Sequence, residues 1–159
     1  MIMNNHAEAL VHSLVPVIYE VTGAQLRLPP GTDMSHTNRC DRLTLTMLQA
    51  LEGRGAPAQR EQHELNVNGD YVWHYLINHT APGIKPAEQD VITDLNPWQY
   101  QDGGSYRRSH TGFLHGPRHE VQQKLDDAGA PEWFVSLRGL STITAAHTPL
   151  LTPYMQNKR

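Results

Sequence analysis

The chain has 159 residues, a formal net charge of −3 with its histidines neutral, and a single cysteine. This length suits one domain that buries a hydrophobic core of its own. The charge excludes a strongly basic protein of the kind that binds nucleic acids or anionic membrane surfaces. No apolar run approaches the roughly 20 residues of a membrane-spanning helix. We therefore expect a single soluble domain over residues 1–159, without nucleic-acid or membrane partners.

The N-terminal segment differs from a secretory signal peptide. It has no lysine or arginine before its apolar part, and it carries Glu8 and His12 within that part. The lone cysteine, Cys40, has no second cysteine for a disulfide, which suits a reducing compartment or a reactive free thiol. We expect a protein that is cytoplasmic, or exported without a conventional signal peptide. A small buried core residue is the other common role of a lone cysteine.

Two helices are predicted in the first third of the chain. Apolar residues recur at helical spacing over 6–22 and again over 40–53. Pro16 lies inside the first helix and predicts a kink or two shorter pieces. The stretch 25–39 is rich in proline and small polar residues and predicts a loop, in which residues 35–38 are candidate caps for the second helix.

The rest of the chain predicts a sheet with a later helix. Asn68-Gly69 is a strong signal for a two-residue hairpin turn, and the run after it is rich in aromatic and β-branched residues. Together with the helices, this pattern predicts an α+β domain with a small antiparallel sheet. The predicted segments are strands over 64–67, 70–77 and 90–95, an irregular region over 96–116 with Gly103-Gly104 at its tip, a helix over 117–128, a short helix or strand over 132–140, and an extended tail over 146–159.

One cysteine, one histidine and one aspartate stand in an order that suits nucleophilic catalysis. Cys40 begins the predicted helix, whose positive dipole end and free N–H groups favour an attacking thiolate and can hold an oxyanion. His74 lies in the strand after the hairpin turn, and Asp94 lies in the next strand. If these strands pair, Asp94 can orient His74, and His74 can take the thiol proton. The sequence predicts Cys40 as nucleophile, His74 as base and Asp94 as orienting group.

This arrangement resembles the papain-like fold in its transglutaminase-like and protein-glutamine-deamidase branches. The resemblance covers residues 38–100. It rests on the Cys-His-Asp order and on three stretches, GRGAPAQRE after the cysteine helix, WHYLI around the histidine and DLNPWQ at the aspartate. It implies thioester chemistry on a carboxamide without a cofactor, by deamidation or transamidation. It also implies a glutamine side chain of a protein partner as substrate, as in bacterial effectors and toxins of this class.

Two departures from the family pattern concern the oxyanion site. The glutamine that precedes the cysteine in papain-type enzymes is missing, and Leu95 and Asn96 separate Asp94 from Pro97. The pattern therefore leaves the second donor to the oxyanion undefined. The candidates for oxyanion binding or substrate positioning are His36, Asn38, Trp73, Trp98 and Gln99.

Three alternatives remain open. The first is a cysteine peptidase or amidase of the same fold, and the second is a non-catalytic binding module in which the three residues serve packing and capping. The third is a metal-binding protein, because a histidine pair at i, i+4 is a zinc-binding arrangement. Against the third, Pro117 stands between His115 and His119 and places His115 before the helix. The candidate metal ligands are His110, His115, His119, Asp102 and Glu120.

Overall fold

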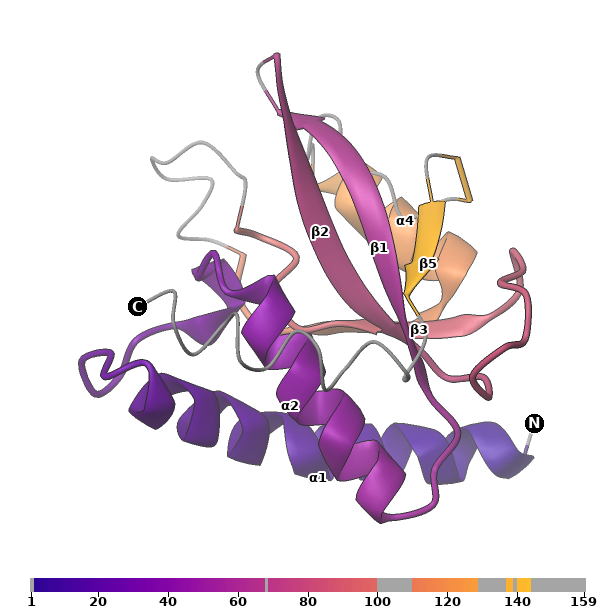
Figure 1. Ribbon diagram of the computed structural model, residues 1–159, viewed down its shortest axis with the longest axis horizontal. Helices are drawn as coiled ribbons and strands as arrows, with labels where there is room; N and C mark the ends of the chain where they lie inside the picture. Colours follow the sequence, from indigo (N-terminus) through magenta and orange to yellow (C-terminus); the bar gives the residue numbers. More distant parts are fainter. Residues whose placement is uncertain (1, 68, 100–109, 129–136, 139, 144–159) are drawn as a thin grey trace.

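The computed structural model describes residues 2–67, 69–99, 110–128, 137–138 and 140–143, and every structural statement below concerns these residues. In this part of the chain, helices pack on both faces of one antiparallel sheet (Figure 1). The predicted α+β class with an antiparallel sheet is therefore confirmed. In chain order, the elements are α1 (Ile2–Gln25), the 3-10 helix η1 (Met34–His36), α2 (Cys40–Gly53), β1 (Gln59–Val67), β2 (Asp70–Asn78), β3 (Val91–Asp94), β4 (Leu114–Pro117), α4 (Arg118–Asp127) and β5 (Leu140–Ile143).

The two N-terminal helices form where apolar residues repeat at helical spacing. α2 has the predicted bounds of 40–53, and its apolar stripe of Leu43, Met47 and Leu51 is buried. α1 is a single helix of 24 residues with Pro16 inside it. Of the two outcomes expected at Pro16, a kink or two shorter pieces, the second is therefore wrong. Pro16 lies on the exposed side of α1. There, water can bind the carbonyl oxygen that loses its helical partner to the proline.

The sheet is built around the predicted hairpin. The strand order is β4-β3-β2-β1-β5, and neighbouring strands are antiparallel. Val67 pairs with Asp70 across a two-residue turn, and Gly69 in that turn has a φ of +89°, which a residue with a side chain rarely adopts. β3 pairs with only the last two residues of β2, Ile77 and Asn78. The remainder of that side of β2 faces the start of α2.

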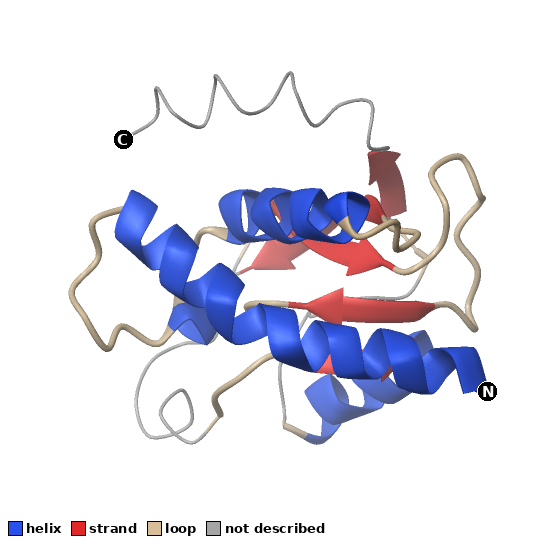
Figure 2. Ribbon diagram, turned by 90° about the horizontal axis from the view of Figure 1, so that it is seen from below, coloured by secondary structure: helices blue, strands red, loops and turns tan. Residues whose placement is uncertain are grey.

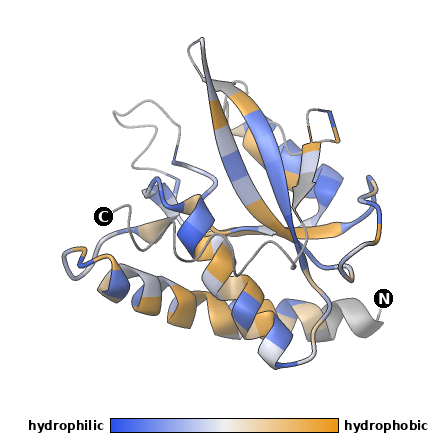
Figure 3. Cartoon of the chain, in the orientation of Figure 1, coloured by the Kyte–Doolittle hydropathy of each residue, from blue (hydrophilic) through white to orange (hydrophobic). Residues whose placement is uncertain are grey.

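β1 begins at Gln59 rather than at Glu64, where the sequence predicted it. Figure 3 shows β1 as largely hydrophilic, although it lies between β2 and β5 inside the sheet. Gln59, Arg60 and Glu61 are each fully buried. An alternation of apolar and polar residues marks a strand in a sequence only when its inward side chains are apolar. The buried polar side chains therefore concealed the first half of this strand.

Two strands lie where the sequence predicted none. β4 falls in the region 96–116 that was predicted to be irregular, because its sequence, LHGP, contains two residues that are rare in strands. It exists because it pairs with the edge of β3, and β5 pairs with β1 in the same way. The predicted helix over 117–128 is confirmed as α4, with Pro117 as its N-cap. Gly103-Gly104, most of 132–140 and the tail over 146–159 lie outside the described residues.

Each face of the sheet has its own hydrophobic cluster. Figure 2 shows the strands between α2 and α4, which confirms that both faces are covered. The face that carries Ile77 packs against α1 and α2. The opposite face carries Leu65, Leu76 and Ile92, which pack against Val121 and Leu125 of α4. Since side chains alternate along a strand, His74 lies on the α4 side, with Leu76.

None of the described helices is both long enough and apolar enough to cross a membrane.

Candidate active site

The predicted nucleophile, Cys40, is the first residue of α2 and is 6% exposed. Arg39 is the N-cap of this helix, and its side chain makes no capping hydrogen bond within the described part of the chain. The prediction that residues 35–38 cap α2 is therefore wrong. Ser35, His36 and Thr37 belong instead to η1 and its C-cap, and Asp33 caps η1 by accepting from the backbone and hydroxyl of Ser35. The positive end of α2 thus points at Cys40 without a side-chain cap.

His74 and Asp94 form a buried pair. The His74 Nε2 and Asp94 Oδ2 atoms are 2.7 Å apart, and the two side chains are 1% and 0% exposed. The pairing of Asn78 with Ile92 extends β3 along β2, so that Asp94 comes out on the face of the sheet that carries His74. The backbone N–H of Asn96 donates to Asp94 Oδ1 at 3.1 Å and fixes the carboxylate. This geometry is that of a histidine held in one orientation by a carboxylate.

The Cys40 thiol lies beside this pair. Its Sγ atom is 3.9 Å from the carbonyl oxygen of Trp73, the residue before His74. The thiol also lies close enough to hydrogen-bond to the His74 side chain, and this contact is one cause of the shift in the histidine's pKa. The structure therefore brings together the three residues that the sequence named, from the start of α2, the middle of β2 and the end of β3.

The protonation of His74 reflects two opposing effects. Burial lowers its pKa, because a charged imidazolium is poorly solvated inside the protein. The Asp94 carboxylate, by its charge and its hydrogen bond, raises the pKa, and the Cys40 thiol adds to this effect. The net result is a pKa above the ordinary value for histidine. A histidine with a raised pKa binds a proton more readily than an ordinary histidine does.

Two side-chain amides from the turn after β3 complete the site. Gln99 Nε2 lies 2.9 Å from His74 Nδ1, and Gln99 Oε1 accepts from Asn96 Nδ2 at 2.7 Å. Asn96 Nδ2 also donates to the carbonyl oxygen of Thr37 at 2.8 Å. The sequence named Gln99 as a candidate but missed Asn96. An asparagine before a proline is a common turn residue, so the sequence gave no reason to expect Asn96 to contact Gln99 beside His74.

The other candidates for oxyanion binding or positioning have separate places. Trp73 lies at the nucleophile through its backbone carbonyl, and its side chain is 47% exposed. Asn38 is exposed, on the loop just before α2. His36 Nε2 binds the carbonyl oxygen of His110, and the indole N–H of Trp98 donates to the carbonyl oxygen of Gly112 at 3.1 Å. His36 and Trp98 therefore tie segment 110–112 to the site. Of the five candidates, the structure places Gln99 in direct contact with the His74 side chain.

The predicted metal ligands do not gather at one point. Among the described residues, no group of three or more histidine, cysteine, aspartate or glutamate side chains could hold a metal ion. His110 stacks on Trp98 with ring centroids 5.0 Å apart. His115 Nδ1 is 2.7 Å from the hydroxyl of Thr93 instead. Asp102 lies outside the described residues.

The Thr93 hydroxyl also binds His79, so two half-buried histidines lie side by side. His79 Nε2 is 2.6 Å from that hydroxyl, and the rings of His79 and His115 are 5.3 Å apart. Burial, assisted by repulsion from His115, lowers the pKa of His79 to about 3. Burial also lowers the pKa of His115. Both rings are therefore held neutral in the folded protein.

This pair should make the fold sensitive to mild acid. Below the unfolded-state pKa of 6.5, the unfolded chain binds a proton that folded His79 refuses, so stability falls as the pH drops from 6.5 towards 3. Replacing His79 by glutamine should reduce the loss of unfolding free energy between about pH 7 and about pH 5 by roughly 2 kcal/mol, as measured by urea denaturation. The control is His119→Gln, at an exposed histidine of α4. Equal acid sensitivity in the wild type and His79→Gln would contradict this account.

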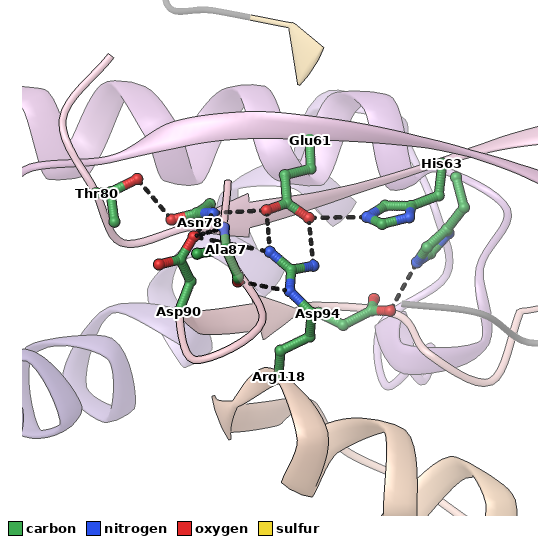
Figure 4. A network of polar contacts seen from close by, with 9 residues as sticks. Glu61, His63, Asn78, Thr80, Ala87, Asp90, Asp94 and Arg118 are labelled. Carbon is green, nitrogen blue, oxygen red and sulfur yellow. Dashed lines mark hydrogen bonds and ion pairs between the residues drawn. The ribbon is translucent and has the colours of Figure 1, made fainter. Parts of the chain in front are cut away.

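A buried ionic network lies beside β2, on the face of the sheet that carries His74 (Figure 4). Glu61 accepts both ends of the Arg118 guanidinium, and it also binds His63 Nε2 at 2.8 Å and Asn78 Nδ2 at 2.6 Å. The glutamate and arginine are 0% and 1% exposed. Burial alone would raise the pKa of Glu61, but the hydrogen bonds and charges of Arg118 and His63 lower it to about 2.

This network positions the histidine strand. His63 is the cross-strand partner of His74, so the Glu61 contacts hold β1 directly beside the proposed base. Arg118 Nε donates to the carbonyl oxygen of Ala87 at 3.2 Å and thereby ties α4 to the loop before β3. The sequence gave no signal for Glu61 or Arg118. They are 57 residues apart, and each type is common on protein surfaces.

Comparison with known proteins identifies no relative. No family model, no curated protein and no solved structure matches the chain. The function is therefore inferred from the geometry of the site.

Proposed function

We propose that the chain is an enzyme of papain-like fold that transfers acyl groups from carboxamides through a Cys40 thioester. The observation that carries this proposal is the contact between three side chains of matched chemistry: the Cys40 thiol, the His74 imidazole and the Asp94 carboxylate. Asp94 and Gln99 already give both ring nitrogens of His74 a hydrogen-bond partner, as a buried histidine requires, so the thiol is an additional contact. Here the thiol at the start of a helix lies against the same histidine, which is the arrangement that nucleophilic catalysis requires.

The proposed reaction begins with proton transfer from the Cys40 thiol to His74. The thiolate attacks the carbonyl carbon, a carbon–sulfur bond forms, and the carbonyl electron pair moves to oxygen. The backbone N–H of Cys40 at the start of α2 is placed to donate to this oxyanion. When the tetrahedral intermediate collapses, the carbon–nitrogen bond breaks and His74 returns the proton to the leaving nitrogen. The products of this half-reaction are a thioester and ammonia or an amine.

The acceptor then decides the outcome. Water attacks the thioester with help from His74, and this step releases a carboxylic acid and regenerates the thiol. With a glutamine side chain as substrate, the sum is deamidation, whereas an amine acceptor gives transamidation. We favour the glutamine of a protein partner because the residues around Cys40, His74 and Asp94 resemble the glutamine-directed branches of the fold. A cysteine peptidase would use the same groups on a backbone amide.

Mass spectrometry on a glutamine-containing probe tests the proposal. We expect the wild type to convert a blocked glutaminyl-glycine dipeptide, or glutamines of an unfolded protein such as casein, with a gain of one mass unit per site. Cys40→Ala should abolish this gain and leave the circular dichroism spectrum unchanged. Because Cys40 is the chain's single cysteine, mass labelling with iodoacetamide reports on this thiol alone.

Each contrary result has a distinct meaning. Cleavage of the probe instead of a mass gain would favour the peptidase alternative. If Cys40→Ala keeps full activity, the thiol is not the nucleophile. If Cys40→Ala unfolds the protein, Cys40 is a core residue, and the proposed function fails.

A further inference from the structure

We propose that Gln99 hydrogen-bonds to the base, His74, in the substrate-free protein and becomes the second oxyanion donor when a carboxamide binds. This inference rests on the proposed function and deepens it. It assigns the missing oxyanion donor to a side chain that follows the aspartate in sequence. It also explains how the thiol would stay protonated and unreactive until substrate binds.

The carbonyl of Thr37 determines which atom donates and which accepts in the hydrogen bonds from Asn96 through Gln99 to His74. The carbonyl of Thr37 can only accept, so the Asn96 atom 2.8 Å from it must be the amide nitrogen. That nitrogen donates its second hydrogen to Gln99, which fixes the oxygen of Gln99 there at 2.7 Å. A flipped Asn96 would place its oxygen against two acceptor oxygens.

The orientation of Gln99 in turn fixes the tautomer of His74. With its oxygen on Asn96, Gln99 presents its nitrogen to His74 Nδ1 at 2.9 Å, and an amide nitrogen only donates. Nδ1 therefore acts as the acceptor, and the ring proton sits on Nε2, where the Asp94 carboxylate accepts it at 2.7 Å. This is the tautomer in which Nδ1 is ready to receive a proton.

Gln99 and the Cys40 thiol compete for the same lone pair. An imidazole nitrogen has one lone pair in the plane of the ring, and that of Nε2 is replaced by the proton shared with Asp94. The thiol can therefore reach the base only at Nδ1, which Gln99 occupies. Cys40 Sγ lies 3.9 Å from the carbonyl oxygen of Trp73 and within hydrogen-bonding reach of the His74 ring, so the thiol is close enough to replace Gln99 at Nδ1.

This hydrogen bond also opposes the effect of Asp94 on the histidine. Asp94 and Cys40 raise the pKa of His74, whereas a donor aimed at Nδ1 disfavours its protonation. Because an amide nitrogen can donate only to an unprotonated Nδ1, we infer that this hydrogen bond offsets the effect of Asp94 and keeps the imidazole neutral and the thiol protonated in the substrate-free site. Removing the Gln99 hydrogen bond should shift the balance towards the imidazolium and the thiolate.

Substrate binding supplies the alternative acceptor. A carboxamide oxygen that arrives beside Cys40 can accept from Gln99 Nε2, and Nδ1 is then free to take the thiol proton. As the thiolate attacks, the carbonyl electron pair moves to oxygen, and the Gln99 N–H and the Cys40 backbone N–H both donate to the negative charge. The Asn96 contact keeps Gln99 5% exposed and close to the site throughout. Gln99 thereby positions the base first and stabilises the oxyanion second.

The test compares thiol reactivity with turnover in Gln99→Leu. Without substrate, iodoacetamide should modify Cys40 about tenfold faster at neutral pH than in the wild type, because Nδ1 is released. Turnover of the blocked glutaminyl-glycine dipeptide should fall about 10²-fold, mainly in kcat, because one oxyanion donor is lost. The matched control is Gln123→Leu, at an exposed glutamine of α4, which should change neither value.

A second readout distinguishes this role from simple support of the fold. In protein labelled with ¹⁵N-histidine, the pH at which the His74 ring titrates should rise by about one unit in Gln99→Leu, because the opposing hydrogen bond is gone. Unchanged or slower alkylation, or a titration that moves to lower pH, would overturn the inference. If the wild type converts no glutamine but Gln99→Leu still accelerates alkylation, the restraint of His74 by Gln99 stands, whereas the oxyanion role and the proposed function fail.

Discussion

Asp94→Asn should reduce turnover by about 10⁴-fold and leave the protein folded, because it reverses the hydrogen-bond polarity at His74 Nε2. The Asp94 Oδ1 atom accepts from the backbone of Asn96, and that position must remain an oxygen in the variant. The new amide nitrogen would then face Nε2. With Gln99 as a donor at Nδ1, both ring nitrogens would face donors, a demand that no neutral tautomer meets.

The measurement is the rate of mass gain on the glutaminyl probe, together with the rate of alkylation of Cys40. Alkylation at neutral pH should slow as well, since the base is held in the wrong tautomer. Asp126→Asn, at an exposed aspartate of α4, is the matched control and should behave as the wild type. A decrease of less than tenfold in Asp94→Asn would show that Asp94 does not orient the base.

The largest expected effect on stability is at Glu61. Replacing Glu61 by leucine removes the partner of Arg118 and of two further donors, His63 and Asn78, inside the protein. Breaking one side of a buried ion pair costs about 3–5 kcal/mol, because the buried guanidinium then loses the carboxylate that binds both of its ends and keeps contacts such as those with Asp90, 4.0 Å away, and with the carbonyl oxygen of Ala87. Guanidinium denaturation should show this loss directly.

The double variant Glu61→Leu, Arg118→Met separates the pair from its surroundings. Since it removes both charges together, it should recover much of the stability lost in the single variant. The surface pair of Glu8 and His12, each with 57% side-chain exposure, provides the control, and Glu8→Leu should change stability by about 1 kcal/mol at most. A cost below about 1 kcal/mol for Glu61→Leu would show that the network contributes little.

The buried network makes the stability of the fold depend on pH, whereas the titration of a solvent-exposed carboxylate leaves stability nearly unchanged. The folded-state pKa of Glu61, about 2, is below its ordinary value of 4.5. The stabilisation it gives is therefore present above pH 4.5 and is lost as the pH falls towards 2. Acid unfolding in that range should be weaker in Glu61→Leu than in the wild type.

The parts of the fold that were predictable from the sequence are those set by local pattern. α2, the hairpin and β3 each have a spacing or turn signal within their own residues, and Cys40, His74 and Asp94 each stand in one of these elements. Their order along the chain was enough to suggest that they meet. The roles assigned to them remain predictions.

The parts that were not predictable depend on partners far away in the chain. In the first half of β1, the buried Glu61 side chain is paired with Arg118 of α4. β4 is a strand because it pairs with the edge of β3. The path from Thr37 through Asn96 and Gln99 to the histidine joins residues from two loops. A contact between two loops produces no repeating pattern within either loop, so it cannot be predicted from local sequence.

The position of Arg118 in the sequence affects when the chain can fold during its synthesis. All the side chains proposed for the reaction have been made by residue 99, whereas the cation that neutralises Glu61 comes 57 residues after it. Until Arg118 leaves the ribosome, β1 carries an unpaired carboxylate that favours water over burial. The nascent chain therefore holds its nucleophile and base before it can close the sheet around them, and we expect a fragment ending before Arg118 to be unfolded and inert.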